Sequence, residues 1–173
     1  MKKLANLFLV ISILFLFGSC VNEKKENKEA TVDFAKEKLE ISILLDNLTR
    51  AFENGNLEKI EEIWWPTEDA LIIGTESGDK LEGWDAISTA IKKQSKNFEK
   101  TLISIADQTI WLNDDATVAW FFEELNYNFV FEEKAMAFEG IRSTGVLQKK
   151  GGVWRLVQEH MSIPAKLEMV ETY

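Results

Sequence analysis

The chain contains one histidine, His160, inside the segment WRLVQEHMSIP at residues 154–164. An imidazole changes charge near neutral pH, so His160 is a candidate general acid or base, or a hydrogen-bond donor to a ligand. If the segment is a regular strand, alternation places His160 on one face with Trp154 and Ser162, and Glu159 on the other face. Glu159 then cannot orient the imidazole. The alternative is a structural histidine that bonds backbone or Ser162 at the end of the strand.

A partner for His160 must come from the preceding predicted strand, which carries Arg142. A three-residue loop within the segment KKGG places Arg142 opposite His160, where the guanidinium favours the neutral imidazole and the pair could bind an anionic or carbonyl oxygen. A loop of two or four residues is expected to place Arg142 opposite Glu159, as a cross-strand ion pair. Either glycine of the segment can supply the left-handed residue of a three-residue loop, which favours the first register.

The chain is rich in large aromatic side chains, with 6 tryptophans and 11 phenylalanines, and it is also rich in acidic residues. Rings fill cores more often than they line pockets, and most acids are solvated. The acids that could face inward are Asp69, Asp107, Glu123, Glu124 and Glu139. The ligand-binding residues that we expect are Arg142, His160, Trp154, Trp120 and Trp65, with His160 as the candidate catalytic residue.

Several site classes have no support in the sequence. One histidine and one cysteine provide no cluster for zinc, and no loop has the spaced aspartates of a calcium site, so we expect no metal and no cofactor. Neither a phosphate-binding glycine loop nor a G-x-S-x-G elbow occurs. The formal net charge of −9 makes the chain a poor binder of nucleic acid, whose phosphates require clusters of lysine and arginine.

Residues 1–19 have the pattern of an export signal, with two lysines before the short apolar run LFLVISILFLFG. The run ends at FGSC, which resembles the lipobox of bacterial lipoproteins. That resemblance implies that Cys20 is the first mature residue, carries lipid and anchors the chain to a membrane of the cell envelope. The alternative is an ordinary signal peptide followed by a free thiol. Residues 20–33 contain few apolar side chains and are expected to form a disordered tether.

Apolar residues recur at helical spacing over residues 34–54 and 57–63, and again over residues 84–98. DALIIG predicts a short strand, TESGDKLEG a polar turn, and the chain after residue 98 four long strands joined by hairpins. This order predicts an α+β domain over residues 34–164, with three helices on the concave face of a curved, mostly antiparallel sheet. Residues 165–173 are expected to form a tail.

The order of these elements, the segment EGWDAI, and GIRSTGVLQKKGGVWRLVQEHMSIP in the closing hairpin resemble the SnoaL-like branch of the nuclear transport factor two-like superfamily, over about residues 36–164. The resemblance implies a cone-shaped, cystatin-like roll, in a superfamily of ketosteroid isomerases, polyketide cyclases, dehydratases and non-catalytic binding or association domains. Tyr127 and Tyr173 do not match the helix-borne tyrosine of ketosteroid isomerases, which argues against that activity.

We therefore expect a small, largely apolar molecule to bind in the cone between the helices and the sheet. One alternative is an isomerase, cyclase or dehydratase that uses His160 with Arg142 or an inward carboxylate. The other is a homodimeric association module, because the outer sheet face is expected to carry Val157 and Met161.

Overall fold

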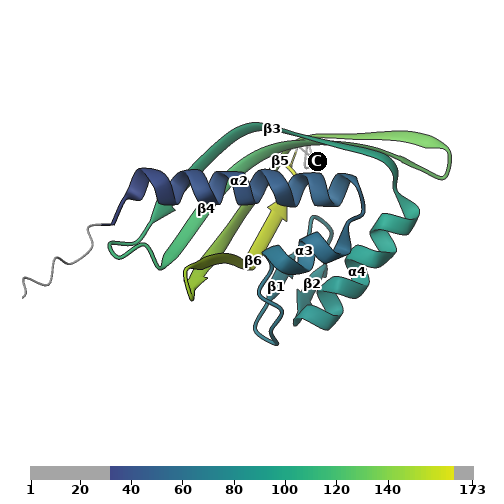
Figure 1. Ribbon diagram of the computed structural model, residues 1–173. Helices are drawn as coiled ribbons and strands as arrows, with labels where there is room; N and C mark the ends of the chain where they lie inside the picture. The colour runs from purple at the N-terminus through teal and green to yellow at the C-terminus, as the bar shows by residue number, and fades with distance from the viewer. Residues whose placement is uncertain (1–31, 166–173) are drawn as a thin grey trace, which may run out of the picture. The chain divides into compact units, whose positions relative to one another are not determined.

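The computed structural model describes residues 32–165, and within this range the chain forms three helices and one six-stranded sheet (Figure 1). This is the α+β fold class predicted from the sequence. The export signal, Cys20, nearly all of the tether and residues 166–173 lie outside the described residues, so the expectations for them stay predictions. None of the helices in the described range is long and apolar enough to cross a membrane.

Helix α2 (Phe34–Glu53) crosses the concave side of the long strands (Figure 1). Its first turn is capped by Asp33, whose side chain accepts a hydrogen bond of 3.1 Å from the Lys36 amide. The helix buries one stripe, formed by Ile41, Leu45, Leu48 and Ala51. The chain leaves the helix at Gly55, where φ is +60°.

The other two helices lie beside each other next to the short strands (Figure 1). Helix α3 (Leu57–Ile63) is capped by Asn56, as its sequence predicts, through a hydrogen bond of 3.0 Å from the Lys59 amide. Helix α4 (Trp84–Asn97) starts after Gly83 and buries Ile87 and Ile91. Both helices therefore present apolar residues to the core.

The sheet has the order β2-β1-β6-β5-β4-β3. All neighbours are antiparallel except β1 and β6, which are parallel. The bounds are β1 (Leu71–Ile73), β2 (Lys80–Glu82), β3 (Glu99–Leu112), β4 (Val118–Phe131), β5 (Lys134–Lys150) and β6 (Val153–Ser162). The segment TESGDKLEG, predicted as a turn, ends in β2, a three-residue strand with only one partner and no buried side chain.

Irregular pairing bends the long strands. The register shifts by one residue at Ala106 of β3, and at Val157 of β6. A third shift, between β4 and β5, contains Gly140, whose φ is +67° and whose amide donates to Asn126 Oδ1 at 3.1 Å. An extra residue bends a strand and increases its twist, so these bulges curve the sheet around α2. Each bulge also changes which residues point inward.

The hairpin between β5 and β6 corrects the expected register. Its turn consists of Gly151 and Gly152 alone, both at positive φ, with Lys150 opposite Val153. Two residues at positive φ are what a type I′ two-residue hairpin turn requires, so the favoured three-residue loop is wrong. The bulge at Val157 then shifts the pairing by one more residue.

As a result Arg142 lies opposite Ser162, and His160 lies opposite Thr144. Neither expected partner of Arg142 is correct. The regular alternation expected along β6 also fails, because Trp154 and Leu156 are buried before the bulge and Glu159 is buried after it. His160 is exposed.

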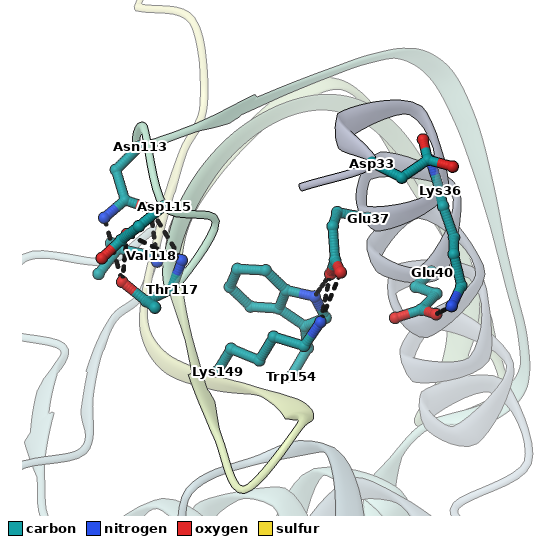
Figure 2. A network of polar contacts seen from close by, with 10 residues as sticks. All are labelled: Asp33, Lys36, Glu37, Glu40, Asn113, Asp115, Thr117, Val118, Lys149 and Trp154. Carbon is teal, nitrogen blue, oxygen red and sulfur yellow. Dashed lines mark hydrogen bonds and ion pairs between the residues drawn. The ribbon is translucent and has the colours of Figure 1, made fainter. Parts of the chain in front are cut away.

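A half-buried polar cluster connects α2 to this hairpin (Figure 2). Lys149 Nζ lies 2.6 Å from Glu37 Oε2, and Trp154 Nε1 donates to the same oxygen at 2.7 Å. The ammonium beside it lowers the pKa of the Glu37 carboxyl, and the indole hydrogen bond adds to the effect. This contact fixes the first turns of α2 against the end of the sheet.

Candidate functional site

A pocket of about 60 Å³ lies under α2, against the inner face of the four long strands; we call it the cone pocket. Its apolar wall includes Leu45, Leu48, Phe121, Leu125, Ile141 and Met161. Its polar side chains are Thr49, Gln94, Glu123, Tyr127 and Glu159. Pockets for drug-sized molecules occupy roughly 300–1,000 Å³, so this pocket suits a small molecule unless its lining moves.

Glu159 is the most unusual group of the cone pocket. The residue is only 6% exposed, and its Oε1 accepts a hydrogen bond of 2.9 Å from Ser143 Oγ. Oε2 is buried and has no hydrogen-bond partner among the described residues. A buried oxygen without a partner costs free energy comparable to a lost hydrogen bond or more, so a ligand that supplied a donor to this atom would be stabilised.

The pKa of Glu159 is raised to about 7, chiefly because burial removes water from the carboxylate; the Ser143 hydrogen bond opposes the rise and the nearby charge of Glu123 contributes to it. Glu159 therefore exchanges its proton near neutral pH. A carboxyl group in this range can act as a general acid in one step and a general base in another.

A second buried carboxyl, Glu123, comes from β4 and is 4% exposed. Gln108 Nε2 donates to Glu123 Oε1 at 2.7 Å, and Gln108 Oε1 accepts from Ser42 Oγ at 2.6 Å. Gln108 points inward because the bulge at Ala106 brings it opposite Glu123. Burial raises the pKa of Glu123, and the hydrogen bond from Gln108 opposes the rise.

Tyr127 marks one end of the cone pocket. Its Oη accepts a hydrogen bond of 2.9 Å from Gln94 Nε2, which joins β4 to α4. Burial raises the pKa of Tyr127 to about 12, so the phenol stays neutral. Both residues, together with Phe52, also line an outer pocket of about 190 Å³ that contains Glu53 and Ser95. The Gln94–Tyr127 pair thus lines both the inner pocket and the outer one.

None of the five predicted ligand-binding residues lines the cone pocket. Arg142 and His160 are exposed, and Arg142 lies opposite Glu124 on its other side. Trp154 is buried and bonded to Glu37. Whether these side chains bind a ligand elsewhere stays a prediction.

The remaining two tryptophans lie in separate places. Trp120 is 44% exposed and lies opposite Trp111 on β3, which is 42% exposed. Trp65 is half-buried, with Lys150 Nζ 4.4 Å from its ring centroid. A cation at this distance from an indole ring is attracted to it, so Lys150 is already a structural partner of Trp65.

Of the five acids that could face inward, Glu123 is buried, and the other four are exposed. Regular alternation placed Glu159 on the outer face, and only the bulge at Val157 turns it inward. A bulge of this kind has no sequence signal here, because Val157 is an ordinary strand residue. Among residues 32–165, no group of three or more His, Cys, Asp or Glu side chains is arranged to hold a metal ion.

The fold has many solved counterparts. An NTF2-like (nuclear transport factor 2-like) superfamily protein from Salmonella enterica serovar Typhimurium is 18% identical, with 80% of this chain and 99% of that chain covered and a TM-score of 0.71. A presumed dehydratase of the NTF2-like family from Streptomyces avermitilis is 14% identical, with 76% and 99% covered and a TM-score of 0.66. A protein with a cystatin-like fold from Caulobacter vibrioides is 20% identical, with 75% and 91% covered and a TM-score of 0.64.

These likenesses, all at low identity, show the fold alone. A search of curated proteins finds no significant match to the sequence. The model of the SnoaL-like domain family matches residues 41–166, which include α2 from Ile41 onward, the whole sheet and every side chain of the cone pocket named above. The chain therefore belongs to the SnoaL-like domain family.

Proposed function

We propose that the protein binds a small, largely apolar molecule in the cone pocket. The observation that carries this proposal is the buried, unpartnered Oε2 of Glu159 in a pocket whose wall is otherwise mostly apolar. An apolar ligand with one polar group would cover the wall and provide the missing partner. Few convergent polar groups within an apolar wall are typical of small-molecule sites.

A thermal-shift screen of small aliphatic alcohols, ketones and amines tests this proposal. A ligand at ten times its Kd adds about 1.4 kcal/mol to the stability of the folded state. For a domain of this size that corresponds to a rise in Tm of roughly 5 °C. If no compound of the panel raises Tm, the proposal is wrong.

Two methionine variants localise the effect. Met161 lines the cone pocket, and Met161→Phe should fill it and remove the rise in Tm. Met136 is 39% exposed and does not line the pocket, so Met136→Phe is the matched control and should keep the rise. Equal shifts in both variants would place the ligand elsewhere.

A second candidate function is catalysis of the isomerase, cyclase or dehydratase type. The observation that favours it is Glu159, a buried carboxyl that faces the pocket and whose pKa burial raises to about 7. We assign the proton transfer to Glu159 because His160 is exposed on the other side of β6. The Glu159 carboxylate would take a proton from a carbon next to a ketone carbonyl, and the C–H electron pair would become the C=C bond of an enolate as the carbonyl π pair moves to oxygen. The Glu159 carboxyl would then return the proton to carbon, which restores the carbonyl.

Solvent exchange tests this chemistry without knowledge of the natural substrate. In D₂O the proton on Glu159 is replaced by deuterium, so 4-methylpentan-2-one should gain deuterium beside its carbonyl faster than in buffer. Glu159→Gln should remove the acceleration, and Glu124→Gln, at an exposed carboxyl, should keep it. Exchange at the buffer rate with the unaltered protein would reject catalysis and leave the binding proposal intact.

We further propose envelope anchoring through lipid on Cys20, supported by the lipobox-like FGSC alone. Metabolic labelling with radioactive palmitate should mark the protein and not its Cys20→Ser variant.

Self-association is also a proposal, now through Trp111 and Trp120 on the outer face rather than Met161, which faces the cone pocket. Light scattering at high concentration should give twice the monomer mass, and a strictly monomeric protein would contradict it.

A further inference from the structure

The charge of the cone pocket is one-sided. Two carboxyls, Glu123 and Glu159, line it, and no lysine, arginine or histidine is among the described lining residues. The two carboxyls lie close enough for the charge of Glu123 to raise the pKa of Glu159. Oppositely charged partners normally accompany buried carboxylates, so the pocket lacks the cation that this arrangement calls for.

The surroundings of the pocket have the same sign. Asp46 and Glu53 of α2 line an outer pocket of about 260 Å³ that shares Thr49 and Ile103 with the cone pocket. The charge of Asp46 raises the pKa of Glu123, and that of Glu53 raises the pKa of Tyr127. Arg50, the cation of this outer pocket, is exposed and does not line the cone pocket.

Apart from Glu123, the side chains that line the pocket with Glu159 are uncharged. Ser143 of β5 donates its hydroxyl to Oε1, and Gln94 of α4 points to Tyr127. Oε2 is therefore an acceptor without a donor whenever Glu159 is ionised. A neutral ketone has no N–H or O–H group that could donate to Oε2, and an alcohol has one donor but no charge. An anionic ligand would be repelled by the carboxylates.

We propose that the cone pocket takes a small aliphatic amine in its protonated form, with the ammonium group between Glu159 and Glu123 and the hydrocarbon against the apolar wall. This inference rests on the proposed binding function and names the chemical class of the ligand. An ammonium carries three N–H donors and a full positive charge, so it provides both a partner for Oε2 and compensation for the carboxylates.

A matched series on one carbon skeleton tests the inference by calorimetry with the full-length chain: 3-methylbutylamine, 3-methylbutan-1-ol and 3-methylbutanoate. We expect the amine to bind at least tenfold more tightly than the alcohol at pH 8, and the carboxylate not to bind. Equal or tighter binding of the alcohol would overturn the amine proposal and keep the binding function. Binding of none of the three, with no hit in the wider screen, would reject both.

Two further readouts depend on the carboxyls. Amine affinity should fall about tenfold from pH 8 to pH 6, because Glu159 takes up a proton near pH 7 and the amine stays cationic. Alcohol affinity should change little. Glu159→Gln and Glu123→Gln should each weaken the amine at least tenfold and change alcohol binding by no more than about twofold. Glu124→Gln, at an exposed position beside Glu123, is the control. Amine binding that is insensitive to both pocket variants would overturn the proposal.

Discussion

Replacing Glu159 by glutamine should make the protein more stable at alkaline pH. Burial raises the pKa of Glu159 from an ordinary value of 4.5 to about 7, so the folded state holds this proton more tightly than the unfolded state does. One pKa unit corresponds to 1.36 kcal/mol, and the shift therefore costs the ionised protein about 3 kcal/mol above pH 7.

The sign follows from proton linkage. Below pH 4.5 both states carry the proton, and Glu159 adds no cost. Between pH 4.5 and 7 the folded state keeps a proton that the unfolded state has lost, so stability falls with pH by up to about 1.4 kcal/mol per unit. Above pH 7 the cost is constant. Glutamine is neutral throughout, so Glu159→Gln removes this part of the pH dependence.

Urea denaturation at pH 5, 6, 7 and 8 measures the effect. The variant should gain about 3 kcal/mol over the unaltered protein at pH 8 and less than about 1 kcal/mol at pH 5. Glu124→Gln, at an exposed carboxyl on the neighbouring strand, should give a difference that does not change with pH. A constant difference between Glu159→Gln and the unaltered protein would refute the reasoning, because it would mean that the carboxyl is not desolvated.

Two other predictions concern the frame of the pocket. Glu37→Gln weakens the contact with Lys149 and should lower the free energy of unfolding, measured by urea denaturation, by roughly 1–3 kcal/mol near pH 7. This difference should shrink as the pH falls through the lowered pKa of Glu37 and the carboxyl takes up a proton. Glu40→Gln, at an exposed ion pair, is the control and should change little. Gly145→Ala places a methyl group 2.6 Å from the backbone oxygen of Gln158, so thermal unfolding should show a loss of at least roughly 1–3 kcal/mol, and an unchanged Tm would contradict the close packing there.

Much of the fold is predictable because it rests on periodic patterns. The apolar spacing over residues 34–54 gives α2 within one residue, and Asn56 predicts the start of α3. The long β-rich runs predict the four long strands and their hairpins. Strand β2 is not predictable in this way, because Lys80–Glu82 has no buried side chain and exists through its pairing with β1.

The site is less predictable because two bulges, each formed by one extra residue in a strand, determine which side chains face the cone pocket. The bulge at Val157 turns Glu159 inward and His160 outward, which inverts the assignment that regular alternation gives. The bulge at Ala106 likewise brings Gln108 opposite Glu123. Both depend on how neighbouring strands pair in three dimensions, and a single valine or alanine within a strand carries no mark of it. Of the five acids that the sequence allows to face inward, the buried one, Glu123, lies before any irregularity of its strand.

The most direct test of ligand binding at Glu159 is a crystal structure of the protein grown with saturating 3-methylbutylamine. We predict electron density for the ligand inside the cone pocket, with its nitrogen within hydrogen-bond distance of Glu159 Oε2 and its methyl groups against Leu45 and Leu125. A bound amine at another site, with the cone pocket holding only water, would contradict this account.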